Sequence, residues 1–303
     1  MFKKSAYRTE LWTVGIVHCP LANLAATGAI KDWPITWLPE MGDFRFIADP
    51  FGIPHDGQHS ILVEALDYRT KRGEIHYYTY DAAWRLMASG LALRAPFHLS
   101  YPQILRCGQD IYLLPEAHKS GKLTLYRAER FPDHWQPVMD LLPLPAIDAS
   151  VVEYQRRFWM FYALPGPNGR AMRELHLAYA DQITGPWRQH ARNPVRIALD
   201  SARPGGTPFI KEGILYLPTQ DCVASYGAAI NLLRIDSLTP TDFSAEIATR
   251  FSPAGLHPNY PDGLHSLSAC GAVTLIDVKR IDPTPARRWI NLQRQLRRLV
   301  GAG

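Results

Sequence analysis

A hairpin-like pattern recurs five times along the chain, and this repeat restricts the fold more than any other feature of the sequence. Each copy opens with a short apolar segment, passes through a tight-turn signal and returns in a second apolar segment. The copies start at positions 49, 101, 148, 206 and 262, at intervals of 52, 47, 58 and 56 residues. Repeats with a period of roughly 20 to 50 residues are typical of solenoids, propellers and arrays.

The spacing inside the copies is also regular. Asp49 and Glu64 are 15 positions apart, and Tyr101 and Glu116 are separated by the same number. Segments with the alternation of half-buried strands lie between the hairpins, at 74–80, 123–128, 175–180 and 230–235. Five hairpins, each with room for two more strands, predict an all-β five-bladed β-propeller with four strands in each blade.

The two ends of the chain complete this picture. Segment 12–17 has the pattern of a strand, and we expect it to join the last blade so that the ring closes without a bare edge. We see no internal boundary, so 1–303 is predicted to be a single domain with the propeller over 12–281. Segment 285–300 predicts a C-terminal basic amphipathic helix, with arginines around an apolar face of Trp289, Leu292, Leu296 and Leu299.

Charge and composition exclude several functions. The net charge is +5, but most of the excess lies at the two ends, so no basic stripe crosses the repeats and we expect no nucleic-acid partner. The four cysteines share no metal-type spacing, and we expect neither a metal nor a cofactor. With no secretory signal and no long apolar run, a cytoplasmic location is expected. The predicted helix either packs under the propeller or rests on the inner membrane surface.

Polar residues flank the repeated strands at one end. A strand pair with a tight turn returns the chain to the end where it started, so these residues are predicted to share one funnel at the propeller axis. They are Asp49, Glu64, Tyr101, Glu116, Asp148, Arg203, Gln220, Asp221, Asp262, His265 and Asp277. Crowded, partly buried carboxylates have pKa values that are driven apart, which suits glycosidic chemistry. Alternatively, the Asp residues that open strands cap turns, and Glu64 and Glu116 pair with Arg69 and Lys119.

Several segments resemble the five-bladed propeller glycosidases of the family 43 type, namely 48–51, 147–150, 185–187 and 193–195. The chain resembles still more closely the family-43-like domain of glucosamine inositolphosphorylceramide transferases and of bacterial proteins fused to formyltransferase-like domains. That likeness extends over about 12–277, through segments 46–51, 100–103, 125–128, 203–206 and 220–222.

The resemblance implies roles for individual residues. Family 43 enzymes use a base in blade one, a pKa-tuning Asp in blade three and a general-acid Glu in blade four. Asp49 matches the first and Asp148 the second, whereas Arg203 stands where the acid belongs. Glu116 or Glu64 therefore takes over as acid, or hydrolysis of the usual kind is lost. Arg203 suits an anionic group such as a phosphate.

Two functions follow from this reading. The first is a carbohydrate-active enzyme that cleaves or transfers at a glycosidic bond of a carbohydrate or sugar phosphate. Its catalytic residues are predicted to be Asp49, Glu116 and Asp148, and its substrate-binding residues are predicted to be Glu64, Tyr101, Arg203, Asp221 and His265. The second is a non-catalytic glycan- or glycolipid-recognition domain that partners a glycosyltransferase. A propeller that binds only protein is a third reading, and it predicts no sugar affinity.

Overall fold

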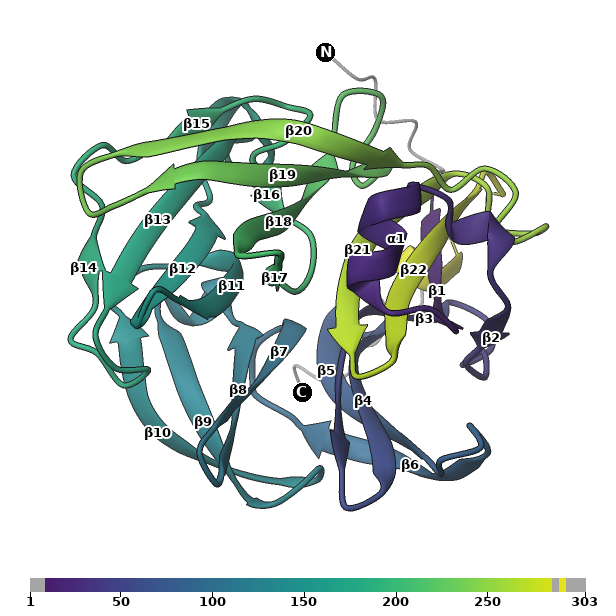
Figure 1. Ribbon diagram of the computed structural model, residues 1–303. Helices are drawn as coiled ribbons and strands as arrows, with labels where there is room; N and C mark the ends of the chain where they lie inside the picture. The colour runs from purple at the N-terminus through teal and green to yellow at the C-terminus, as the bar shows by residue number, and fades with distance from the viewer. Residues whose placement is uncertain (1–8, 285–288, 293–303) are drawn as a thin grey trace.

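The chain forms five β-sheets arranged as blades around a central axis (Figure 1). This is a computed structural model, and it describes residues 9–284 and 289–292. The all-β five-bladed propeller predicted from the repeat is confirmed. The predicted C-terminal helix at 285–300 falls largely outside the described residues. Within the described residues, no helix is both long and apolar enough to span a membrane.

Each blade takes consecutive strands, except the fifth. Blade one contains β3 (Arg45–His55), β4 (Gln58–Asp67), β5 (Arg72–Tyr80) and β6 (Leu86–Leu93). Blade two contains β7 (Ser100–Cys107), β8 (Asp110–Glu116), β9 (Leu123–Arg130) and β10 (His134–Leu142). Blade three contains β11 (Ile147–Tyr154), β12 (Arg157–Ala163), β13 (Glu174–Ala180), β14 (Arg188–Gln189) and β15 (Arg196–Ile197). Blade four contains β16 (Arg203–Pro204), β17 (Phe209–Lys211), β18 (Ile214–Asp221), β19 (Ala229–Leu238) and β20 (Phe243–Phe251).

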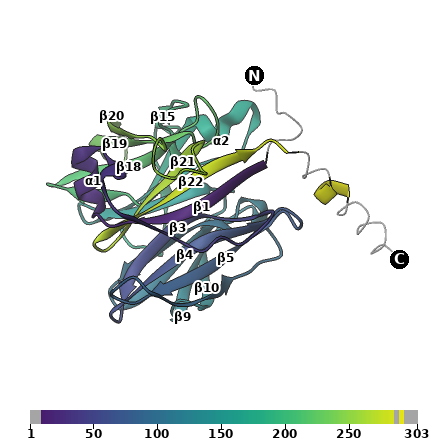
Figure 2. The same ribbon diagram turned by 90° about the vertical axis from the view of Figure 1, so that its right-hand side faces the viewer.

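The fifth blade joins the two ends of the propeller. It contains β21 (Gly263–Cys270) and β22 (Val273–Asp282), followed by β1 (Thr9–Val17) and β2 (Ile35–Trp37). β1 pairs antiparallel with β22 along its whole length, from Thr9 opposite Asp282 to Val17 opposite Thr274 (Figure 2). The prediction that segment 12–17 completes the last blade is therefore confirmed.

A tight turn connects the innermost strand of each blade with the next strand, and in blade four this turn joins β17 to β18. In each case two residues separate the strands, and at least one of them has a positive φ, as in Asp56-Gly57, Gly108-Gln109, Gln155-Arg156, Glu212-Gly213 and Gly271-Ala272. Two-residue turns of this kind match the right-handed twist of the strands that they join. After the turn, the chain runs back to the end where the inner strand began, and the polar residues lie at that end.

Apolar packing between neighbouring blades holds the ring together. Five clusters of buried apolar side chains occupy the five blade interfaces. Between blades one and two, for example, Phe51 and Leu62 pack with Leu99 and Leu113. Burying each such side chain contributes about 1.5 to 3 kcal/mol to folding, so the interfaces fix the inner strands firmly.

Short helices lie outside this framework. They are α1 (Leu21–Thr27) and α2 (Arg170–Arg173), with the 3-10 turns η1 (Ile30–Asp32), η2 (His118–Ser120) and η3 (Pro167–Gly169). α1 covers the junction of blades four and five, where Leu21 and Leu24 join the same apolar cluster as Ile230 and Phe251. Thr249 in blade four donates a hydrogen bond to the carbonyl of Ala25, 3.3 Å away.

Candidate active site

The inner strands of four blades carry a bulge at the same place, and the first bulge residue bears a functional side chain. These residues are Asp49, Tyr101, Asp148 and His265, each of which lies where two residues oppose one on the neighbouring strand. Three of them adopt positive φ, at 51° for Asp49, 45° for Tyr101 and 50° for Asp148. Non-glycine residues held there cost free energy, and such strain gathers at functional sites. The repeated bulge thus aims one side chain per blade at the centre.

Blade four departs from this pattern because β16 and β17 are separated by a glycine pair. Gly206 has a φ of 139°, and a Cβ on it would lie 2.0 Å from the carbonyl oxygen of Leu267. Its amide instead donates to the hydroxyl of Tyr101, 2.6 Å away. Only glycine allows the backbone of blade four to approach the centre so closely.

Tyr101 braces the centre. Its ring is fully buried, and its hydroxyl bonds with Ser150 of blade three at 2.7 Å and with the carbonyl of Gly206 in blade four at 3.2 Å. The sequence suggested a substrate-binding role for this residue. In the structure its side chain is fully buried and connects blades two, three and four, so it is not open to a ligand.

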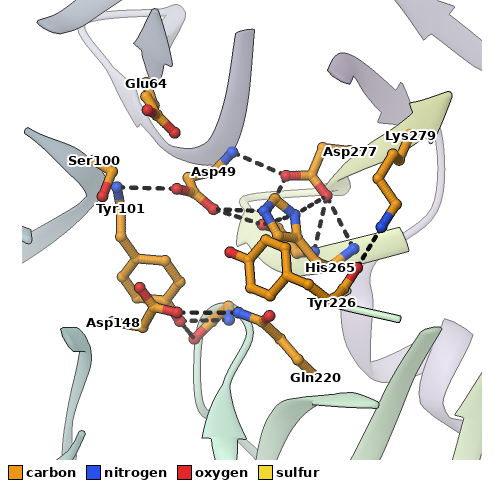
Figure 3. Close-up of polar contacts among 12 residues, drawn as sticks. Asp49, Glu64, Ser100, Tyr101, Asp148, Gln220, Tyr226, His265, Asp277 and Lys279 are labelled. Carbon is orange, nitrogen blue, oxygen red and sulfur yellow. Dashed lines mark hydrogen bonds and ion pairs between the residues drawn. The ribbon is translucent and has the colours of Figure 1, made fainter. Parts of the chain in front are cut away.

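Asp277 accepts a hydrogen bond that connects the fifth blade with blade one. It is completely buried, and it accepts hydrogen bonds from the backbone amides of Asp49, His265 and Ser266 at 2.9, 3.1 and 2.9 Å (Figure 3). The Ser266 hydroxyl and His265 Nδ1 add two more, at 2.9 and 2.7 Å. Burial raises the pKa of Asp277, but the charge and hydrogen bonds of His265 and these amides outweigh it, so the net pKa is lowered.

His265 lies between two carboxylates. Its Nδ1 faces Asp277, and its Nε2 is 3.5 Å from Asp49 Oδ1. Trp12 of β1 stacks on the ring at 3.7 Å between centroids and holds its plane. Burial alone lowers the pKa of His265, yet the two facing carboxylates raise it overall. The ring therefore favours the charged form that donates from both nitrogens.

These three residues could also hold a metal, because one donor atom from each lies within 4.8 Å of the others. The oxygens of Asp277, however, already accept hydrogen bonds from five donors. Both nitrogens of His265 are likewise directed at carboxylates. The arrangement fits a proton held between Asp49 and His265 better than a cation.

Asp49 is the acid with a pKa close to neutrality. Burial raises its pKa to about 7, the positive charge of His265 opposes this rise, and the negative charges of Asp148 and Asp277 add to it. Its oxygens accept hydrogen bonds from the Tyr101 amide and the Ser266 hydroxyl, both at 3.3 Å. A carboxyl that titrates near the working pH suits a general base.

Glu64 and Glu116 occupy matching places in blades one and two, where they pair with Ala48 and Ser100. Burial raises the pKa of Glu64 well above its usual range, and the charges of Asp49, Glu116 and Asp148 raise it further. The pKa of Glu116 is lowered, because hydrogen bonding and charge from His118 together outweigh burial. Glu64 therefore holds its proton to a higher pH than an ordinary carboxyl does, whereas Glu116 loses its proton at a lower pH.

Of the two acids that the sequence offered as proton donor, these pKa directions favour Glu64 over Glu116. Glu116 was the expected proton donor, but its carboxylate accepts hydrogen bonds from His118 Nδ1 and from the Ser100 hydroxyl at 3.2 Å. Glu64 was expected to bind substrate. Its nearest base is His98, whose Nε2 lies 3.4 Å away and whose Nδ1 accepts a hydrogen bond from the Gly73 amide.

Asp148 is held by blade four. Arg203 Nε donates to its Oδ2 at 2.7 Å, and Gln220 Nε2 donates to the same oxygen at 3.0 Å. Burial raises the pKa of Asp148, the charge of Arg203 opposes this and the charge of Glu116 adds to it. The Arg203 side chain is 12% exposed, and its guanidinium lies over the ring of Tyr226, 5.1 Å from the ring centroid. The expected anion-binding Arg203 is thus first of all the partner of Asp148.

Two predicted residues of the shared funnel lie elsewhere. Asp221 pairs with Arg250 in an opening on blade four that is also lined by Asp200 and Asn231, so it does not join the acidic cluster. β18 directs Gln220 inward, and the next residue points away because side chains alternate along a strand. Asp262 accepts a hydrogen bond from the Ile281 amide at 2.7 Å, and His265 takes the bulge position three residues later.

Sequence reasoning missed four residues around the acids: Trp12, His98, His118 and Tyr226. His118 follows Glu116 by two positions, so its pairing with that acid could have been predicted from the sequence. Tyr226 lies in the irregular loop between β18 and β19, where no repeat signal marks it. His98 is far from Glu64 in sequence and meets it only because blades one and two adjoin.

Comparison with solved structures first defines the class, which is the five-bladed propeller fold shared by glycoside hydrolases. A family 117 glycoside hydrolase, Zg3597 from the marine bacterium Zobellia galactanivorans, aligns with a TM-score of 0.55 and 16% identity, over 80% of this chain and 86% of that one. The α-L-arabinofuranosidase PaAbf62A from Podospora anserina aligns with a TM-score of 0.56 and 10% identity, over 82% and 95%. CoXyl43, a β-xylosidase/α-arabinofuranosidase from a compost metagenome, aligns with a TM-score of 0.54 and 12% identity, over 81% and 93%.

Sequence comparison then defines the family. Residues 32–256 match the family described as glucosamine inositolphosphorylceramide transferase 1, N-terminal, and the chain belongs to it. Proteins named glucosamine inositolphosphorylceramide transferase 1 are 35% identical in Oryza sativa subsp. indica and 30% identical in Arabidopsis thaliana, over 72% and 69% of this chain. The chain spans only 31% and 28% of these relatives. The resemblance stated from the sequence is confirmed, and the match includes the acids of blades one to three but not His265 or Asp277.

Proposed function

We propose that the centre of the propeller binds a sugar and acts at its glycosidic bond. Asp49 serves as general base, Glu64 as proton donor and Asp148 as the group that orients the substrate. The relatives are named for the transfer of a sugar-containing group, and the solved neighbours include glycosidases, which supports a carbohydrate as ligand.

The observation that carries this proposal is the contrast between two acids of blade one. Asp49 has a pKa of about 7, whereas burial and neighbouring negative charges keep Glu64 protonated well above its ordinary range. Glycosidic chemistry requires one carboxylate that accepts a proton and one carboxyl that donates one. The two residues share one strand pair, so the propeller holds both in fixed places.

The proposed step is balanced in atoms and charge. Asp49 takes a proton from an attacking hydroxyl, which belongs either to water or to an acceptor sugar. The oxygen of that hydroxyl forms a bond to the anomeric carbon while the bond to the leaving oxygen breaks. Glu64 gives its proton to the leaving oxygen. Asp148, fixed by Arg203 and Gln220, accepts a hydrogen bond from a sugar hydroxyl and sets the ring in place.

A second function is favoured by a different observation. Several acids of the cluster already face a basic group: Asp148 faces Arg203, Glu116 faces His118 and Glu64 faces His98. Arg203 also stands where the resemblance to family 43 calls for an acid. In such a network the bases neutralise the acids, and the polar groups can bind sugar hydroxyls without cleavage of a glycosidic bond. In that case the domain recognises a glycan for a partner transferase.

Turnover and binding should be measured on the same proteins. The probes are 4-nitrophenyl glycosides of glucosamine, xylose and arabinose, with free glucosamine and glucosamine 1-phosphate for calorimetry. If the site is catalytic, Asp49→Asn abolishes turnover but changes sugar affinity by less than about tenfold, because Asn keeps the size and shape of the side chain and one of its two acceptor oxygens. Asp221→Asn is the matched control, since Asp221 is buried to the same degree but lies outside the cluster.

Three outcomes separate the alternatives. Turnover in wild type that Asp49→Asn loses supports the enzyme. Sugar binding without turnover, retained by Asp49→Asn, supports the recognition domain. If none of the probes binds to or is turned over by the wild-type protein, both proposals fail.

A further inference from the structure

Tyr226 reaches the acidic cluster from a loop that is tightly anchored. The loop between β18 and β19 lies against His265, because Gly227 has a φ of 58° and a Cβ on it would lie 2.6 Å from His265 Cβ. The Leu264 amide donates to the carbonyl of Gly227 at 3.0 Å. Lys279, which is completely buried, donates through Nζ to the backbone carbonyl of Tyr226. The backbone of Tyr226 is therefore fixed relative to the fifth blade.

The ring of Tyr226 is also held on several sides. It meets His265 edge-on at 5.4 Å and Trp12 edge-on at 6.3 Å between centroids. Arg203 covers one face at 5.1 Å from the ring centroid. Cation–π contact and edge-to-face packing both restrict the rotation of the side chain. The hydroxyl is thus presented in a defined direction.

That direction is toward the centre. Figure 3 shows the hydroxyl end of Tyr226 pointing into the space bounded by Asp49, Tyr101 and Asp148. Among the residues that the structure describes, none forms a hydrogen bond with this hydroxyl. Burial raises the pKa of Tyr226 well above its usual range, and the charges of Asp148 and Asp49 add to the rise although Arg203 opposes it. The group is a neutral donor at any physiological pH.

We infer that Tyr226 is a substrate-contacting residue, whose hydroxyl donates a hydrogen bond to a sugar oxygen held between Asp49 and Asp148. The inference rests on the proposed function and deepens it. A sugar hydroxyl can accept from Tyr226 and at the same time donate to a carboxylate, so it satisfies both neighbours. A group that only donates, or an anion beside two carboxylates, does not fit this position as well.

The test uses Tyr226→Phe, which keeps the ring contacts to Arg203, Trp12 and His265 and removes only the oxygen. Calorimetry with glucosamine, xylose and arabinose should show about tenfold weaker binding of the sugar that wild type prefers, the loss expected for one hydrogen bond. The matched control is Tyr162→Phe, because the Tyr162 hydroxyl is also without a partner but lies in the apolar cluster between blades two and three. This control should bind the sugar as wild type does.

A series of monodeoxy versions of the preferred sugar identifies the contacted oxygen. Wild type should discriminate against one deoxy sugar by about tenfold, and Tyr226→Phe should lose that discrimination alone. Thermal unfolding of both variants confirms that they are folded. Equal affinity of Tyr226→Phe and wild type overturns the inference while the proposed function stands. Absence of sugar binding in wild type overturns the proposed function, and the inference with it.

Discussion

Removing the charge of Asp49 should stabilise the protein in a pH-dependent way. The pKa of Asp49 rises from 3.8 to about 7 on folding, because the folded protein buries the carboxyl among other acids. Each pH unit of difference between the two pKa values corresponds to about 1.4 kcal/mol, so ionising Asp49 costs up to about 4 kcal/mol of folding free energy. A raised carboxyl pKa means that stability is lost as the pH rises from 3.8 to about 7 and is level above that range.

The Asn side chain of Asp49→Asn cannot ionise, so this variant does not lose this part of its folding stability as the pH rises. The difference in unfolding free energy between the variant and wild type should grow by roughly 2 to 3 kcal/mol between pH 5 and pH 8, in favour of the variant. Urea unfolding at the two pH values measures it. Glu116→Gln gives a contrast. The lowered pKa of Glu116 means that its ionised form stabilises the fold, so this variant should be less stable than wild type by an amount that stays level between pH 5 and pH 8. If the Asp49→Asn difference does not change with pH, or falls, the electrostatic account of the cluster is wrong.

Three further predictions concern neighbouring residues. Glu64→Gln should slow glycosides with poor leaving groups far more than 4-nitrophenyl glycosides, because only the former need a donated proton; equal slowing argues against Glu64 as the donor. Arg203→Ala should weaken the binding of glucosamine 1-phosphate more than that of glucosamine, as calorimetry can measure, and equal losses show that Arg203 serves Asp148 alone. Gly206→Ala should lower the melting temperature by several degrees, since the added Cβ collides with the backbone at Leu267; an unchanged melting temperature contradicts this.

Much of the fold could be predicted because the repeat consists of local sequence patterns. Short apolar strands, two-residue turns and an interval near 50 residues all depend on neighbouring residues in the chain. The closing strand was predicted because a propeller with a bare edge is unfavourable. The positions of Asp49, Tyr101 and Asp148 followed from their common phase in the repeat.

The arrangement of the site could not be predicted to the same extent, for physical reasons. The hydroxyl of Tyr101 and the amide of Gly206 meet across the axis, although the residues lie in blades two and four. The pKa values of Glu64 and Glu116 differ because Glu64 is buried among other acids, whereas Glu116 is hydrogen-bonded to His118. The matching positions of the two acids in the repeat do not reveal this difference. Tyr226 comes from a loop outside the repeat, so only the folded backbone brings it to the centre.

The pH dependence of kcat/KM for a glycoside that the wild-type protein turns over tests the central claim most directly. As the general base, Asp49 with its pKa of about 7 predicts a rate that rises through pH 7 as its carboxyl ionises. Burial and neighbouring negative charges raise the pKa of Glu64 well above its usual range, and the rate should fall where Glu64 loses its proton. In Glu64→Gln the falling limb should disappear while the rise through pH 7 persists. A rate that is flat through pH 7, or no turnover of any probe, contradicts the assignment of the central acids to catalysis.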